Sequence, residues 1–208
     1  MTNQCWLSVQ PRPRRASKMP ADTRDKILQA AFTRLSSQGY ENTSIKEIAE
    51  EAGVAQGLVH YYFKSKQQLV LAVLMDVCAK LEIYGPELGE AGALAAFENF
   101  KSVLRTRRDA HNLYVELIGV GLHDREVGTG IRDDIRRHRG EVEDIARQVL
   151  AQREVDPGPA RAIASVVWGA ILGIIVQSLV DEQFNSDEAV DALAAMALSA
   201  VYPGTQSA

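Results

Sequence analysis

TSIKEIAEEAGVAQGLVHYYFKSKQQL, residues 43–69, is the stretch that decides the fold. Ser44 and Glu47 predict a helix start, because they form a capping box in which the serine side chain accepts a free backbone N–H and the glutamate reaches back. Gly53 breaks this helix, and a second short helix is predicted over 55–62. Two short helices joined by a glycine-containing turn of this length are typical of a helix-turn-helix, whose second helix enters a major groove.

The second of these helices has an outward face that suits an anionic surface. At about 100° per residue, Gln56 and His60 align, and Gly57 and Tyr61 lie beside them on the side opposite Val59. The face is polar and aromatic and carries no acidic group. Gly57 has no side chain, so the backbone can approach base edges closely.

Charge is distributed unevenly along the 208 residues, whose net charge is -4. Residues 1–70 carry ten Lys/Arg against six Asp/Glu, whereas residues 71–208 carry thirteen against twenty-one. This asymmetry indicates that only the first part of the chain meets a polyanion.

The decisive stretch, preceded by a helix ending in QGYENT, resembles the amino-terminal domain of TetR-family transcriptional regulators. The resemblance covers about residues 22–70 and includes the Ile-Ala…Ala-Gly-Val turn, the Tyr-Phe pair before Lys64 and the Ser-Lys opening of the fourth helix. The chain departs from the family at His60, where tyrosine is common, and at Ala55, where serine or threonine is common.

The resemblance implies an all-α fold of about nine helices in two domains. We expect a disordered basic arm over 1–21, a helix-turn-helix DNA-binding domain over 22–67, and a helical ligand-binding and dimerisation domain over 68–208. The simpler interpretation of residues 1–21 is a disordered tail, or a start upstream of the true one at Met19. The alternative is a basic arm that lies along DNA.

The resemblance also assigns DNA contacts to individual residues. Some residues match positions that touch DNA phosphates, and such contacts fix the register of the protein on the duplex without reading the base sequence. These residues are Thr43, Ser44, Tyr61, Tyr62 and Lys66. Residues nearest base edges are Lys46, Gln56, Gly57 and His60. A solvated surface lysine remains the alternative for Lys46, and a core aromatic remains the alternative for Tyr62.

The remainder of the chain is predicted to be helical throughout. A long helix opens at Ser65, and the later helices are predicted over 91–108, 110–123, 128–153, 160–181 and 186–201. Residues 162–180 carry no charge, which by length admits a membrane span. We expect instead that this helix is buried on two sides, against its own domain and against a second copy of the chain, because the residues flanking it include no pair of basic membrane anchors.

Burial against a second copy implies a homodimer, and the resemblance implies that the helices 160–181 and 186–201 form its interface. Two recognition helices then imply a pseudo-palindromic DNA operator. An unknown small-molecule effector is expected to bind in the helical domain and to shift the long helix from Ser65. The favoured function is therefore a dimeric repressor released by that effector.

The effector site is predicted from side chains that could line an apolar cavity or supply buried polar groups. The candidates are Phe97, Phe100, Tyr114, Glu116, His123, Trp168 and Leu172. Simple core packing is the alternative for the aromatic residues, and an internal bond or a solvent-facing position is the alternative for Glu116 and His123.

The sequence is compatible with two other functions, a helical protein–protein adaptor and an enzyme. The four histidines, His60, His111, His123 and His138, have no two-His zinc spacing. No phosphate loop or nucleophile elbow is present in the sequence. We therefore expect no catalysis, no cofactor and no metal, with His123-Asp124 as a weak metal signal.

The compartment is predicted from the cysteines and the amino terminus. Cys5 and Cys78 are the only cysteines, too few for a disulfide framework. The first twenty residues lack the apolar core of a secretory signal. We therefore expect a cytoplasmic protein with no membrane partner.

Overall fold

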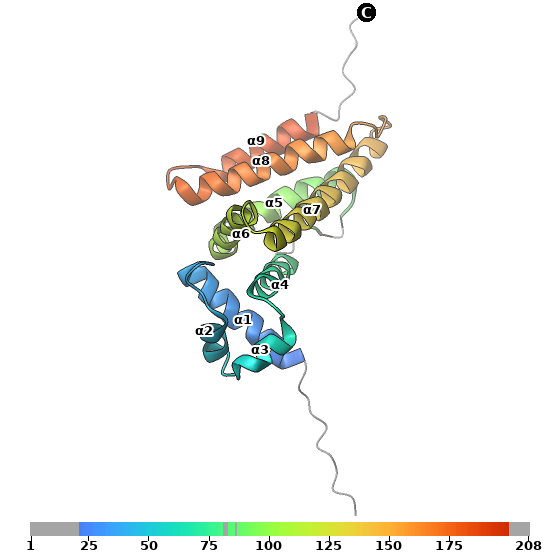
Figure 1. Ribbon diagram of the computed structural model, residues 1–208. Helices are drawn as coiled ribbons and strands as arrows, with labels where there is room; N and C mark the ends of the chain where they lie inside the picture. Colours follow the sequence, from blue (N-terminus) through green and yellow to red (C-terminus); the bar gives the residue numbers. More distant parts are fainter. Residues whose placement is uncertain (1–20, 81–82, 86, 200–208) are drawn as a thin grey trace, which may run out of the picture.

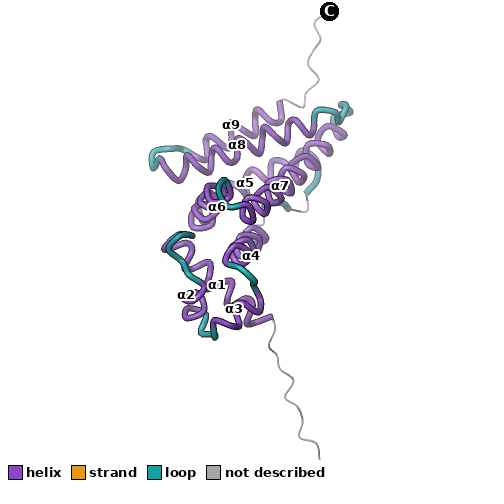
Figure 2. The backbone as a smooth tube through the Cα atoms, viewed as in Figure 1, coloured by secondary structure: helices purple, strands orange, loops and turns teal. Residues whose placement is uncertain are grey.

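The structure is a computed structural model that describes residues 21–80, 83–85 and 87–199. Within these residues the chain forms nine helices and no strand, so the all-α prediction is confirmed (Figures 1 and 2). The helices are α1 (Ala21–Gln38), α2 (Ile45–Glu51), α3 (Gln56–Tyr62), α4 (Lys66–Ala79), α5 (Gly89–Thr106), α6 (Arg108–Gly121), α7 (Arg125–Gln152), α8 (Ala160–Val180) and α9 (Ser186–Ser199). Of the predicted arm over 1–21, residues 1–20 lie outside the described residues, as does the predicted helix end at 200–201, whereas Ala21 begins α1.

Local sequence signals set the geometry of α1–α3. The predicted capping box opens α2: Glu47 N–H donates to the Ser44 hydroxyl (3.2 Å), and Ser44 N–H donates to the Glu47 carboxylate (2.8 Å). Gly39 ends α1 and Gly53 ends α2, with φ of +78° and +65°, where a side chain would be strained. Α helix-turn-helix therefore forms where the sequence predicted one.

The start of α7 differs from the prediction, which placed it at 128. The helix begins at Arg125 because the Asp124 side chain caps it, accepting N–H bonds from Glu126 (2.9 Å) and Val127 (3.0 Å). The sequence had offered Asp124 as part of a weak metal signal. Its role in the structure is that of a helix N-cap.

The helices form a small head at one end and a larger body at the other. Figure 1 shows α1–α3 as the head, with α4 leading from it to α5–α7, and α8 and α9 side by side at the far end. One hydrophobic core runs through both parts, because Ile27 of α1, Leu69 of α4, Leu117 of α6 and Trp168 of α8 belong to the same buried cluster. A movement in the body can therefore reach the head through packed side chains.

Candidate nucleic-acid interface and ligand cavity

The outward face of α3 is exposed as the sequence predicted. Gln56, Gly57 and His60 are exposed, the Tyr61 side chain is 79% exposed, and Val59 on the opposite side is fully buried. Every side chain on the outward face is uncharged or basic. The helix therefore offers hydrogen-bonding groups and no repelling carboxylate to a polyanion.

The residues at the head of α2 differ in how available they are. Lys46 is exposed, with only a loose 3.9 Å approach to Glu50. Thr43 is buried, and its hydroxyl donates to the Gly39 carbonyl (2.7 Å), so it braces the loop between α1 and α2. Ser44 is exposed and is used as the cap of α2.

Tyr62 takes the core position that the sequence left open as the alternative to a phosphate contact. Its ring is half-buried and packs against the core of the head. It also meets the Tyr61 ring edge-on, with centroids 5.3 Å apart. Tyr62 therefore holds Tyr61 in place on the exposed face.

Lys66 is tied into the protein and does not project freely. Its ammonium donates to the Tyr40 carbonyl and lies 4.1 Å from the centroid of the Tyr40 ring, a cation–π contact. Burial lowers the pKa of Lys66, while the nearby carboxylates of Glu41 and Glu116 oppose that effect. Lys66 therefore fixes the end of α1 against the start of α4.

Glu116 was predicted near the ligand, but the structure places it at the junction of head and body. Its carboxylate accepts the Tyr40 N–H (2.6 Å). Gly39 has a φ of +78°, which favours glycine, and a Cβ there would come within 2.8 Å of the same carboxylate and displace it. A second link joins the Gln67 amide to the Asp124 carboxylate (3.0 Å). The first bond connects α6 to the head, and the second connects the turn after α6 to the start of α4.

A cavity of about 100 Å³, lined mainly by apolar and aromatic side chains, lies in the body. Four of the predicted ligand residues line it together, namely Phe97, Phe100, Tyr114 and Trp168. The other three lie elsewhere: Glu116 at the junction, His123 exposed in the turn after α6, and Leu172 packed against the main hydrophobic core. The turn after α6 carries His123 away from the cavity.

Several lining residues were not predicted as a site, because they come from helices whose packing the sequence does not specify. Cys78 reaches the cavity from α4, His111 from α6 and His138 from α7. Burial lowers the pKa of His111 to about 4 and raises the pKa of Cys78 to about 12. It also raises the pKa of Tyr84 and Tyr114. These four groups are uncharged at neutral pH.

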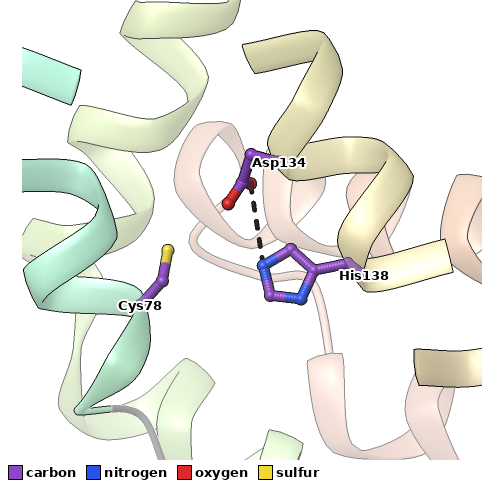
Figure 3. Close-up of side chains that lie close together, drawn as sticks. All are labelled: Cys78, Asp134 and His138. Carbon is purple, nitrogen blue, oxygen red and sulfur yellow. Dashed lines mark ion pairs between the residues drawn. The ribbon is translucent and has the colours of Figure 1, made fainter. Parts of the chain in front are cut away.

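A polar cluster borders the cavity where α4 meets α7. Figure 3 shows the Cys78 sulfur and the side chains of Asp134 and His138 pointing toward one another. One donor atom from each lies within 4.8 Å of those from the other two. Arg137 adds an ion pair with Asp134, and the His138 Nδ1 lies 3.0 Å from Glu141. The sequence gave no signal for this cluster, because Cys78 lies far from the other two along the chain.

The outer side of α8 is apolar and uncovered in the single chain. A stripe at helical spacing is formed by Val166, Gly169, Gly173, Val176 and Val180. The three valines are exposed, and a Cβ at either glycine would meet nothing within 4 Å. By length and composition α8 could cross a membrane, although a third of its most apolar window is buried inside the body.

The exposed acid-free helix and the helix-turn-helix geometry define a DNA-binding protein of the helix-turn-helix class. The family description "Bacterial regulatory proteins, tetR family" matches residues 27–73, which comprise most of the head and the first part of α4. The head of this chain and the start of α4 are therefore similar to the amino-terminal domain of TetR-family transcriptional regulators.

Curated relatives match mainly in the head. The repressor KstR2 of Mycolicibacterium smegmatis is 42% identical over 57 residues, which are 27% of this chain and 28% of that protein. The regulator CymR of Pseudomonas putida is 24% identical over 180 residues, 82% of this chain and 86% of CymR. These relatives are transcriptional regulators and not enzymes.

Solved structures share the whole fold at low sequence identity. A TetR-family regulator from Rhodococcus sp. has a TM-score of 0.74 at 20% identity and covers 88% of this chain and 100% of its own. FadR from Bacillus subtilis, solved in complex with stearoyl-CoA, has a TM-score of 0.67 at 18% identity, covering 86% and 99%. At these identities the likeness shows the fold alone.

Proposed function

We propose that this chain is a dimeric repressor that binds a pseudo-palindromic operator and is released when an uncharged, mainly apolar effector fills the body cavity. The observation that carries the DNA-binding part is the exposed α3 face, on which Gln56, Gly57, His60 and Tyr61 lie together without an acidic neighbour on that face. Gln56 is suited to pair with adenine N6 and N7, and Tyr61 to contact a phosphate. Such a protein acts in the cytoplasm, where the DNA is.

The dimer is supported by the apolar stripe on α8. An exposed apolar helix face in a chain that is otherwise well packed marks an interface. The two glycines of the stripe allow two helix backbones to approach closely. Two copies related by a two-fold axis present two α3 helices, which suits half-sites about 34–36 Å apart.

The effector's chemistry follows from the cavity lining. Apolar and aromatic side chains form most of the wall, and Cys78, His111, Tyr84 and Tyr114 are neutral there. A charged ligand group would lose its hydration against such a wall without gaining an opposite charge. We therefore infer a neutral ligand for this chain, in contrast to the stearoyl-CoA held by FadR.

Release is proposed to pass through α6 and α4. Helix α6 carries His111 and Tyr114 at the cavity and Glu116 at Tyr40. Helix α4 carries Leu74 and Val77 at the cavity and Lys66 at the same Tyr40. A ligand that binds better to a cavity with α4 displaced shifts the dimer toward that arrangement.

The test is DNA binding by the purified dimer to the DNA flanking its own gene. We expect a sequence-preferring complex that weakens steeply with salt. Gln56→Ala should change the sequence preference, with discrimination reduced by about 1–3 kcal/mol at one base pair. Loss of salt sensitivity, or an unaltered preference in the variant, contradicts the assignment of α3.

The assignment of the cavity as the effector site is tested with a variant in which a larger side chain fills the cavity. Ala96→Phe places a ring in the cavity wall, whereas Ala91→Phe on the exposed side of the same helix is the matched control. Small neutral aromatic compounds are screened for release of the operator. Compounds that release the parent protein should fail on Ala96→Phe and succeed on Ala91→Phe; equal release of both variants contradicts the cavity as the effector site.

A further inference from the structure

The polar cluster between α4 and α7 borders the cavity, and the proposed repressor mechanism assigns no role to its Asp134 and His138 donor groups. Cys78 lies in the last turn of α4, and Asp134 and His138 stand four residues apart on one face of α7. The two α7 side chains are almost fully buried. The donor atoms lie within 4.8 Å of one another, and in Figure 3 all three converge on the space between the two helices.

We propose that Cys78, Asp134 and His138 bind a divalent transition-metal ion of the zinc type. Thiolate, imidazole and carboxylate together are a donor set that Zn²⁺ takes, whereas Ca²⁺ and Mg²⁺ prefer oxygen alone. Zinc sits about 2.0–2.3 Å from such atoms, so the three donors need only a small contraction to reach one ion. The inference does not depend on the proposed repressor function.

The histidine is already held as a metal-binding histidine would be. Its Nδ1 lies 3.0 Å from the Glu141 carboxylate, and its ring stacks on Trp168 with centroids 4.7 Å apart. A carboxylate that accepts a hydrogen bond from Nδ1–H leaves the Nε2 lone pair for a metal and fixes the ring orientation. Nε2 faces Asp134 Oδ2 at 3.6 Å.

Two buried polar atoms meet at the same point without a hydrogen bond of good geometry. They are Asp134 Oδ2 and the Tyr114 hydroxyl, and the Asp134 carboxylate is close enough to Tyr114 to help raise its pKa. Buried polar atoms are normally satisfied, and a carboxylate oxygen that lacks a donor is well suited to a cation. The Tyr114 hydroxyl or a water molecule can complete a tetrahedral set.

Arg137 competes with a metal ion for the Asp134 carboxylate. Its guanidinium pairs with Asp134 Oδ1 and lies 3.4 Å from His138 Nε2. Its side chain is 44% exposed and also reaches Glu141 (3.3 Å), so it can move outward while keeping one carboxylate partner. Metal binding therefore exchanges one cation for another at Asp134. The bound ion would clamp the end of α4 to α7.

The first experiment loads the full-length, chelator-treated chain with Co²⁺ and then with Zn²⁺. We expect one ion per chain, a thiolate-to-cobalt charge-transfer band, and displacement of Co²⁺ by Zn²⁺. Cys78→Ser should abolish the band and weaken Zn²⁺ binding at least tenfold, whereas the matched control Cys5→Ser should retain both. A band that disappears only with Cys5→Ser overturns the proposal.

A second pair of variants keeps the proposal testable if removing Cys78 harms folding. Arg137→Gln removes the competing cation and should raise Zn²⁺ affinity severalfold, with a larger zinc-induced rise in Tm than in the parent chain. His138→Gln should lose that rise, whereas His123→Gln in the exposed turn should keep it. Absence of stoichiometric binding in the parent chain, or weaker binding in Arg137→Gln, shows that the cluster is an internal ion-pair network only.

Discussion

The outward faces of α3 and α8 are both uncovered in the single chain, yet they differ in every chemical respect. The α3 face is short, polar and free of acid, and its largest exposed side chain is Tyr61. The α8 face is long and uncharged, with Val166 and Val180 exposed and small residues between them. The α3 face is suited to contact with a polyanion, whereas the α8 face is suited to contact with another apolar surface.

The difference teaches that exposure alone does not identify a partner. The polar face depends on individual side chains, so a single change there should alter binding and leave the fold intact. The apolar face depends on complementarity over its whole length, so one charge should disrupt assembly. The predictions below separate the two faces by the size and kind of effect.

The largest effect is expected from Val166→Glu, which buries a charge in the proposed α8 interface. We expect the dimer to dissociate at micromolar protein and operator affinity to fall by two orders of magnitude or more, because a monomer presents only one α3. Sedimentation equilibrium and fluorescence anisotropy measure the two effects.

Leu122→Glu is the matched control, since Leu122 is equally exposed but lies in the turn after α6. It should stay dimeric and bind the operator as the parent does. If Val166→Glu also remains dimeric, α8 is not the interface.

The next effect concerns His111 and pH. Burial lowers the pKa of His111 in the folded state to about 4. The negative charge of Asp109 opposes this shift, and the positive charge of Arg107 adds to it. As pH falls, the imidazole of His111 is therefore protonated in the unfolded chain before it is protonated in the folded chain. The free energy of unfolding decreases as pH falls from about 6.5 toward 4, by up to about 3 kcal/mol. Urea denaturation at fixed protein concentration should show this slope. His111→Gln should flatten it, and the exposed His123→Gln should not; an equal slope in His111→Gln contradicts the assignment.

The head was predictable from sequence because its signals are local. The capping box at Ser44, the glycine at 53 and the spacing of Gln56 and His60 each act within one helical turn. The body was predictable only as helices and as a uniformly apolar α8. Which side chains meet in the cavity depends on how α4, α6 and α7 pack, so Tyr114 and Trp168 were found by size whereas Cys78 and His138 were missed.

A smaller effect is expected at the junction that joins the two regions. Glu116→Gln keeps the shape but weakens the bond to Tyr40 N–H, which is charge-assisted and part-buried. We expect a loss of about 1–2 kcal/mol in the free energy of unfolding, with altered operator release by effector. Glu50→Gln, an exposed carboxylate in the head, should change stability by less than about 0.5 kcal/mol. Equal stability of Glu116→Gln and the parent chain would show that the junction bond contributes nothing.

The smallest expected change in folding comes from Tyr61→Ala, which sharpens the contrast with α8. The ring is 79% exposed and touches mainly the edge of Tyr62, so removing it should leave the urea midpoint within error. If the hydroxyl contacts a phosphate, affinity for every DNA sequence should fall about tenfold, or about 1.4 kcal/mol, with a shallower salt dependence. Anisotropy on operator and unrelated duplexes at several salt concentrations measures both quantities. A fall for the operator alone would instead make Tyr61 a base-reading residue and would move sequence recognition toward the end of α3.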